Sequence, residues 1–242
     1  MEEVIQTEKE GKMPTKIEWT DETVNPLGWW CFGTGTKDNP KHCEYCYAKK
    51  IALRGINKCE LCNTFITLHT HFEQLEKLSK WKKPKNIFIQ SMGDLFHGDV
   101  PDEWIQEVFN ACEQAPQHRY LFLTKNPERY KQYNKYMPNN MWFGATATKP
   151  GRLGFDTHHS WNTFISIEPI QAEFPNCYPK NISWLIVGAE TGNRKGKVIP
   201  KREWIENIVN ACRDANVPVF LKNNLAKIWG EPLIQEYPWR AE

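Results

Sequence analysis

The chain has 242 residues, of which 40% are hydrophobic, and this size and apolar content suit one large α/β domain. Its 31 basic and 29 acidic residues give a formal net charge of +2, which argues against binding nucleic acid or membranes through overall charge. No run approaches eighteen apolar residues, and the N-terminal residues lack the apolar core of a signal peptide. We therefore expect a cytoplasmic protein with no membrane partner.

Residues 1–15 are polar, and we expect them to form a loose tail before a single domain over residues 16–242. A short strand over Thr23–Asn25, ended by Pro26, would place the next residues at the carboxyl end of a sheet, where α/β proteins keep their chemistry. A helix is then predicted over Tyr47–Leu53.

Between these two elements the stretch CFGTGTKDNPKHCEYCY carries three cysteines, Cys31, Cys43 and Cys46. The C-x-x-C spacing lets Cys43 and Cys46 reach one metal centre, and a glycine-containing loop lets Cys31 join them. A 4Fe-4S cluster needs four ligands, so three thiolates leave one iron open to a small molecule. S-adenosylmethionine is the small molecule whose radical chemistry uses such clusters.

Four further metal-competent side chains follow near residues 56–72, in what we expect to be an insertion: Cys59, Cys62, His69 and His71. Two alternatives remain for this second C-x-x-C pair. It could close a structural zinc site together with the first C-x-x-C pair. It could instead form a separate zinc site with the two histidines, which would face the same side of an extended segment. Cys112, Cys177 and Cys212 stand alone and are expected to be buried apolar side chains.

From residue 85 onward, short apolar runs alternate with segments of helical periodicity, the pattern of parallel strands joined by helices. The predicted strands cover residues 87–91, 120–124, 141–146, 163–168, 184–189 and 219–222. Apolar stripes predict two sheet-packed helices of similar sequence, Pro101–Ala115 and Pro200–Ala215. The predicted fold class is therefore α/β, a partial or near-complete parallel barrel of about six to eight strands.

In a parallel sheet, the residues that end the strands meet at one face. The predicted strands end in more polar side chains than helix capping explains, so we expect a ligand site there. Its members are Ser91, Gly93, Asp94, Thr124, Lys125, Thr146, Thr148, Glu168, Glu190, Lys222 and Asn223. In the sequence SMGD, Gly93 would let the backbone approach a ligand, and Asp94 would supply a charge partner for it. A simple turn followed by a helix cap is the alternative.

The cysteine stretch resembles the radical S-adenosylmethionine superfamily, because Tyr45 completes a C-x-aromatic-C pattern, although eleven residues separate Cys31 from Cys43 instead of the usual short spacing. In that superfamily a glycine-rich turn with an acidic residue follows the second strand and holds the methionine ammonium, and the resemblance implies this role for Gly93 and Asp94. The ordered motifs KIEWTDxTxNP, CYA, SMGDLFH, FLTKNPER, ISIEP and IVGAETG are similar to a phage-associated three-cysteine-motif family, catalogued mainly as a domain of unknown function. This resemblance implies a barrel of the radical-SAM type and supplies no substrate.

The resemblance implies an enzyme in which Cys31, Cys43 and Cys46 hold the cluster, and an electron donor reduces it to cleave S-adenosylmethionine to a 5'-deoxyadenosyl radical. Tyr45 would lie near the adenine of S-adenosylmethionine. The other predicted cofactor-binding residues are Gly93, Asp94, Thr146, Thr148, Glu168 and Glu190. The substrate candidates, placed for anionic groups, are Lys125, Lys222 and Asn223.

A basic loop makes nucleic acid or a nucleotide the substrate class to consider, since it could grip phosphates. Its charged residues are Arg194, Lys195, Lys197, Lys201 and Arg202. A solvated loop with no binding role is the simpler alternative. Two other functions remain open: a non-catalytic zinc-binding, nucleic-acid-binding module built on Cys43, Cys46, Cys59 and Cys62, and a cluster-bearing regulator that never cleaves S-adenosylmethionine.

Overall fold

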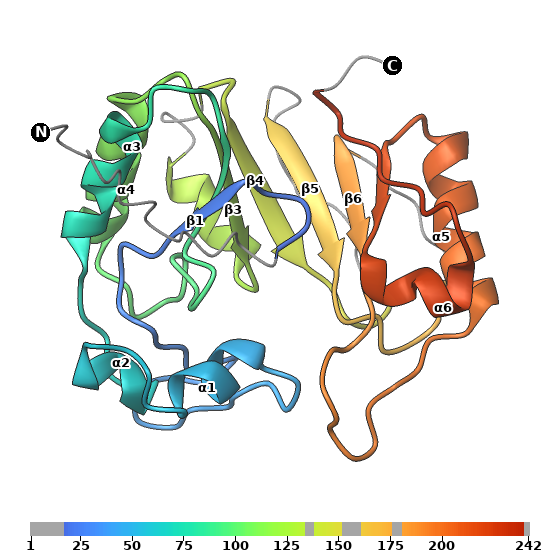
Figure 1. Cartoon of the computed structure of the whole chain (residues 1–242), viewed down its shortest axis with the longest axis horizontal. Coiled ribbons are helices and arrows are strands. Elements are labelled where there is room, and N and C mark those ends of the chain that lie inside the picture. The colour runs from blue at the N-terminus through green and yellow to red at the C-terminus, as the bar shows by residue number, and fades with distance from the viewer. Residues whose placement is uncertain (1–16, 134–137, 152–160, 176–180, 240–242) are drawn as a thin grey trace, which may run out of the picture.

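Seven parallel strands form one sheet in strict chain order, and the sheet curls into a half-barrel (Figure 1). The computed structural model describes residues 17–133, 138–151, 161–175 and 181–239. The strands are β1 (Glu22–Val24), β2 (Asn86–Ile89), β3 (Arg119–Thr124), β4 (Met141–Thr146), β5 (Asn162–Ile167), β6 (Trp184–Val187) and β7 (Val219–Leu221). The α/β fold class predicted from the sequence is thus confirmed, and the number of strands lies within the expected range.

Helices connect or flank these strands. They are α1 (Tyr47–Ala52), α2 (Glu60–Thr64), α3 (Glu76–Lys80), α4 (Asp102–Glu113), α5 (Arg202–Asp214) and α6 (Ala226–Trp229), with 3-10 turns η1 (Phe72–Leu75), η2 (Pro127–Tyr133) and η3 (Asn223–Leu225). The predicted helices correspond to α1, α4 and α5. The expected loose tail at residues 1–15, and Cys177, lie outside the described residues. Among the described helices, none is both long and apolar enough to cross a membrane.

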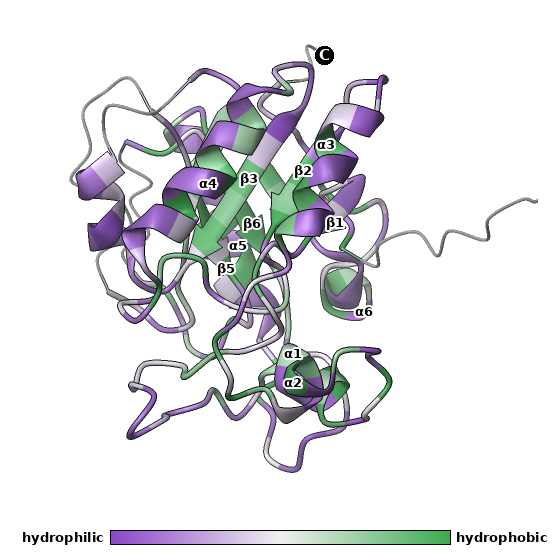
Figure 2. Ribbon diagram, turned by 90° about the vertical axis from the view of Figure 1, so that its left-hand side faces the viewer, coloured by the Kyte–Doolittle hydropathy of each residue, from purple (hydrophilic) through white to green (hydrophobic). Residues whose placement is uncertain are grey.

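The hydrophobic core has two layers, one on each face of the sheet. On the outer face, alternate strand residues such as Ile87 and Phe122 pack against the apolar stripes of α4 and α5, for example Phe109 and Ile208. Figure 2 shows α4 with polar residues on its solvent side and apolar residues toward the strands. This arrangement follows from the period of two in the strands and of 3.6 in the helices.

The inner face of the half-barrel is filled with aromatic side chains. Its residues, from strands and from the segment before β1, are Trp19, Phe88, Leu121, Trp142, Phe164, Trp184, Ile186 and Phe220. Segments from both ends of the described chain meet here, because the Tyr237 hydroxyl donates to the Glu18 carbonyl (3.3 Å) and the Asn223 N–H donates to the Glu18 carboxylate (2.6 Å). The segment around Gln235 also runs antiparallel along β7 and covers that edge of the sheet.

The carboxyl ends of the strands point toward α1 and α2, which lie beside one another at the lower side of the molecule (Figure 1). The loop from the end of β1 to α1 contains the three cysteines Cys31, Cys43 and Cys46. The fold therefore places the cysteine loop at the end of the sheet where the polar strand ends also lie.

Candidate functional site

The three thiols of Cys31, Cys43 and Cys46 belong to one loop at the carboxyl end of the sheet. Burial raises the pKa of Cys31 to about 12, and the nearby Asp94 and Cys46 add to this rise. Burial also raises the pKa of Cys46, to which Cys43 contributes, so each thiol lies within electrostatic reach of the next. Backbone N–H groups point at two of the sulfurs, from Gly33 to Cys31 (3.2 Å) and from Lys49 to Cys46 (3.4 Å). Such N–H donors stabilise sulfur that carries negative charge.

The eleven residues between Cys31 and Cys43 fold back on themselves, which returns the chain to its starting point. Gly33 adopts a φ of 65° and pairs with Lys41, whose carbonyl accepts from the Thr34 N–H (3.2 Å) and whose N–H donates to the Phe32 carbonyl (2.8 Å). The left-handed conformation at Gly33 favours glycine at this turn. The long spacing of this motif is thus compatible with three neighbouring thiols.

The turn after β2 fastens the segment that leads to Cys31. Gln90 has a φ of 64° and its buried side chain accepts from the Leu27 N–H (3.0 Å) and donates to the Gly28 carbonyl (3.3 Å). A Cβ added at Gly93 would come within 2.6 Å of the Trp30 carbonyl oxygen. Gly93 is therefore required for close packing against the residue before Cys31, which is a different reason from the ligand approach predicted from the sequence.

Asp94 joins the ends of β2 and β3. Its buried carboxylate accepts from the Thr124 hydroxyl (2.7 Å), the Phe96 N–H (3.0 Å) and the Lys125 N–H (3.0 Å). Two of these donors share Oδ1, so Oδ2 keeps capacity for one further donor. The predicted contact to a ligand ammonium would have to use that remaining position.

Tyr45, Lys125 and Thr148 gather beside the thiols. Burial raises the pKa of the Tyr45 phenol, and Cys43 and Thr148 both interact with its hydroxyl. The Lys125 Nζ lies 6.0 Å from the centre of the Tyr45 ring. Its positive charge is also near enough to Cys31 to lower the pKa of that thiol, which partly offsets the effect of burial. Four of the predicted strand-end residues therefore lie near the cysteine loop. They are Asp94 after β2, Thr124 and Lys125 at the end of β3, and Thr148 after β4.

The remaining strand-end carboxylates are engaged by cations. Glu168 forms an ion pair with Lys222 across the ends of β5 and β7. Glu190 receives two hydrogen bonds from Arg194 (2.7 and 2.8 Å), and this guanidinium lowers the pKa of the Glu190 carboxyl. The same Arg194 reaches Glu44 inside the cysteine motif (3.2 Å), so it ties that loop to the far side of the half-barrel.

Two further strand-end residues, Thr146 and Asn223, have surroundings that differ from those described above. Thr146 ends β4 and is half-buried. The Asn223 N–H donates to the Glu18 carboxylate, and its side-chain oxygen accepts from Gln235 (3.0 Å). Asn223 thus links the segment before β1 to the segment that runs along β7.

The second C-x-x-C pair joins the two histidines. The ligand atoms of Cys59, Cys62, His69 and His71 all lie within 4.8 Å of one another. Within the residues that the structure describes, no other group of three or more Cys, His, Asp or Glu side chains is gathered for a single metal ion. In the described structure, Cys59 and Cys62 thus gather with the two histidines and not with Cys43 and Cys46.

Several contacts that hold the cysteine loop were not predicted from the sequence. The Tyr47 hydroxyl donates to the Ser91 carbonyl, which links α1 to the turn after β2. The His97 Nε2 contacts the Gly35 carbonyl (3.1 Å), and the Asp99 carboxylate accepts from the Lys37 N–H (3.2 Å). The proximity of Tyr47 to the CxxC motif was the one signal available, since the other contacts join distant parts of the chain.

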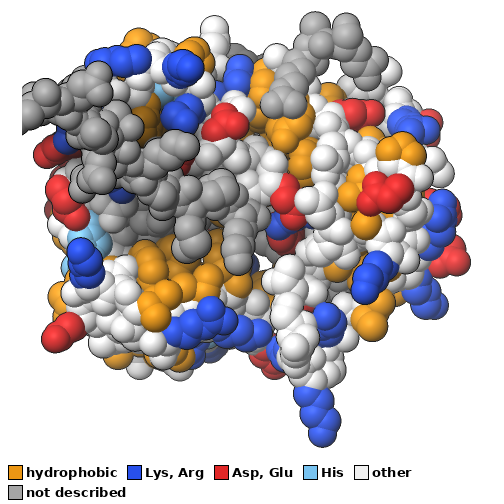
Figure 3. Space-filling view, viewed as in Figure 1, with side chains coloured by type: hydrophobic (Ala, Val, Ile, Leu, Met, Phe, Trp, Pro, Cys, Tyr) orange, Lys and Arg blue, Asp and Glu red, His pale blue; other side chains and the backbone are white. Residues whose placement is uncertain are grey.

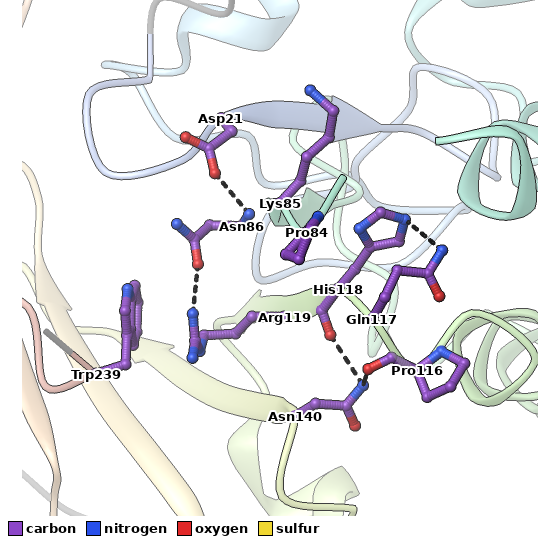
Figure 4. A pocket seen from close by; sticks show the side chains of 10 residues that line it. All are labelled: Asp21, Pro84, Lys85, Asn86, Pro116, Gln117, His118, Arg119, Asn140 and Trp239. Carbon is purple, nitrogen blue, oxygen red and sulfur yellow. Dashed lines mark hydrogen bonds between the residues drawn. The ribbon is translucent and has the colours of Figure 1, made fainter. Parts of the chain in front are cut away.

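A separate cavity lies at the opposite edge of the sheet. It has a volume of about 300 Å³ and is lined by residues at the amino ends of β2 and β3, among them Asn86, His118 and Arg119 (Figure 4). The Arg119 guanidinium lies 4.3 Å from the ring centre of Trp239. None of the predicted site residues lines this cavity.

Comparisons with known proteins agree with this architecture. No curated protein matches the chain. A mutant of spore photoproduct lyase matches in structure with a TM-score of 0.54, over 87% of this chain and 78% of that chain, at 10% identity. This likeness shows the fold alone, a TIM-like partial barrel of parallel strands. The sequence pattern of a family described as "Protein of unknown function (DUF5131)" matches residues 14–235, nearly the whole chain, and the chain therefore belongs to this family.

Proposed function

We propose that this chain is a radical S-adenosylmethionine enzyme that holds a 4Fe-4S cluster through Cys31, Cys43 and Cys46. The observation that supports the proposal is that these three thiols lie in one loop at the carboxyl end of a half-barrel, with Cys46 within electrostatic reach of both Cys31 and Cys43. Cysteine thiolates are the usual ligands of such clusters. The cysteines of a cube bind different iron atoms, so their sulfurs need not gather as closely as the ligands of a single ion.

The surroundings of the thiols fit a cluster. Without metal, burial keeps the Cys31 and Cys46 thiols protonated, whereas a bound cation would replace those protons. The N–H groups of Gly33 and Lys49 already point at two of the sulfurs. Hydrogen bonds to cluster sulfurs and the charge of a nearby lysine such as Lys125 are known means of tuning these centres.

When bound, the reduced cluster and S-adenosylmethionine supply a 5'-deoxyadenosyl radical that removes hydrogen from a substrate. The protein's own residues would bind and orient. Tyr45, with its ring beside Cys43 and Thr148, is placed to pack on the adenine. The remaining acceptor position of Asp94 would take the ammonium group. Glu168 and Lys222 would line the substrate side together with Thr146 and Glu190.

We propose nucleic acid or a nucleotide as the substrate class. This class is the first to test because the family resemblance implies an association with phages. Figure 3 shows Lys and Arg side chains along the lower edge of the molecule, where α1 and the loop after β6 lie. Arg194 in that loop is held by Glu190 and Glu44, and Arg202 is held by Glu206. Of the five basic residues, Lys195, Lys197 and Lys201 are therefore the cations for a phosphate backbone. Neutralising these three lysines should abolish salt-dependent retention on DNA or RNA, and unchanged retention would contradict this assignment.

The test of the enzyme is anaerobic purification and reconstitution, followed by iron and sulfide analysis and turnover with dithionite as electron donor. We expect a brown protein that releases 5'-deoxyadenosine from S-adenosylmethionine. Cys31→Ala should lose iron, whereas Cys112→Ala, a buried cysteine in α4, should keep it. A fully loaded cluster that releases no 5'-deoxyadenosine would favour the regulator, and a protein that binds no iron would overturn the proposal. The cytoplasm is the compartment that we propose, since it keeps such thiols reduced.

A further inference from the structure

We propose that Cys59, Cys62, His69 and His71 bind one zinc ion, and that this ion fixes the chain segment that delivers Cys31. The zinc site stands on its own geometry. Its effect on Cys31 rests on the proposed function above, because that effect concerns a cluster ligand. The two parts are therefore tested separately.

The distances between the four side chains match a tetrahedral ion. The His69 Nε2 lies 3.4 Å from both the Cys59 and the Cys62 sulfur, and the His71 Nε2 lies 3.3 Å from Cys62. Zinc binds sulfur at about 2.3 Å and imidazole nitrogen at about 2.0–2.1 Å, so a sulfur and a nitrogen bound to one tetrahedral ion are about 3.5–3.6 Å apart. The three measured sulfur–nitrogen separations lie within about 0.3 Å of this distance.

The Nδ1 atom of each histidine, which faces away from the cysteines, makes the hydrogen bond that metal-bound histidines usually make. The His69 Nδ1 lies 2.7 Å from the Thr67 carbonyl, which can only accept, so Nδ1 carries the proton. The His71 Nδ1 lies 2.9 Å from the Glu73 carboxylate in the same way. Each neutral ring is thereby left with an Nε2 lone pair facing the cysteines, and this outer contact is the usual companion of a metal-bound histidine.

Thiol–imidazole hydrogen bonds alone do not explain the group. Three sulfur–nitrogen contacts exist, but the two thiols together supply only two protons. Cys62 is fully buried, and its sulfur already accepts from the Trp29 N–H (3.3 Å). One divalent cation shared by two thiolates and two neutral imidazoles satisfies all the contacts and leaves no net charge to bury. Zinc suits this tetrahedral set of two sulfurs and two nitrogens.

The site is attached directly to the segment before Cys31. The Gly28 N–H donates to the His69 carbonyl (2.8 Å), and a Cβ at Gly28 would lie 1.9 Å from the His69 ring. The His71 N–H donates to the Pro26 carbonyl (2.7 Å) on one side of this segment. Farther along, the Cys31 N–H reaches the Phe65 carbonyl (3.5 Å). The ion would thus hold residues 26–31 against the insertion and set the position of the first cluster ligand.

The zinc site is tested by metal analysis of the full chain in which Cys31, Cys43 and Cys46 are all changed to Ala, so that no cluster can form. We expect about one zinc per chain. Adding Cys59→Ser and Cys62→Ser should reduce this to near zero. Because the latter variant can fail to fold, Co²⁺ titration of zinc-stripped triple-Ala protein is the second measurement. Tetrahedral thiolate-to-cobalt absorption supports the site, and its absence together with zinc-free protein overturns it.

The effect on Cys31 is tested with Gly28→Ala in the otherwise wild-type chain. The added methyl collides with the His69 ring, so we expect loss of zinc and a several-fold loss of reconstituted iron. The matched control is Gly98→Ala, where a Cβ has nothing within 4 Å and both metals should remain. If zinc is lost while iron loading is unchanged, the proposed positioning of Cys31 is overturned and the zinc site stands. If the wild type takes up no iron at all, the proposed function fails independently of the zinc result.

Discussion

Replacing Arg129 by Met should destabilise the protein strongly, because this buried guanidinium serves backbone carbonyls. It lies in η2 and donates to the His97 carbonyl, the Val100 carbonyl (2.5 Å) and the Asp102 carboxylate (2.6 Å). Met keeps the apolar stem but leaves the buried Val100 carbonyl without its donor, whereas the His97 carbonyl keeps a second donor, the Val100 N–H (3.0 Å). An unsatisfied buried acceptor costs about 1–3 kcal/mol, so we expect a loss of about 1–3 kcal/mol in the free energy of unfolding.

The assay is urea unfolding of the cluster-free chain, with Lys131→Met as the matched control. Lys131 lies two residues away in the same turn and forms only an exposed ion pair with Glu128 (2.6 Å). Exposed pairs of this kind contribute less than about 1 kcal/mol. If Arg129→Met costs no more than Lys131→Met, the account of the loop at residues 97–100 is refuted. Reconstituted iron should also fall in Arg129→Met, because His97 supports Gly35 in the cysteine loop.

Two further predictions concern contacts that hold the cysteine loop. Gly93→Ala should cost about 1–3 kcal/mol and reduce iron loading, because its methyl would meet the Trp30 carbonyl oxygen at 2.6 Å; wild-type loading would contradict this. Arg194→Leu should lower the melting temperature at neutral pH. Arg194 depresses the pKa of Glu190, so its contribution is present above the ordinary value of 4.5 and is lost as the pH falls through the folded pKa. The two proteins should therefore converge in acid, and a difference that persists at low pH would refute this.

The strands were predictable because they are buried on both faces and read as short apolar runs. The predicted run at 141–146 coincides with β4, whereas that at 87–91 continues past Ile89, the last residue of β2. There Gln90 turns into the left-handed region to bond the segment before Cys31. The apolar pattern of residues 87–91 does not predict this turn, because Leu27, the hydrogen-bond partner of Gln90, lies more than sixty residues away in sequence.

The sequence was sufficient to predict which residues lie near the cysteines, but not the hydrogen bonds that each of them makes. Strand order brought Asp94, Lys125 and Thr148 to the cysteines, as the rule for parallel sheets requires. What each side chain bonds to was not predictable, because Glu190 is engaged by Arg194 from a loop without periodicity. Likewise, only the folded insertion separates the two C-x-x-C pairs, which sequence spacing alone could have joined in one site.

The strict order of the strands has a consequence for a chain still emerging from the ribosome. Each new strand can dock on the one just made, so the sheet can lengthen one strand at a time without waiting for later parts of the chain. The contacts of Glu18 with Asn223 and Tyr237 span more than two hundred residues and must come last. Until then the aromatic inner surface stays uncovered at one end, which makes the nearly finished polypeptide the species most exposed to aggregation and to chaperones.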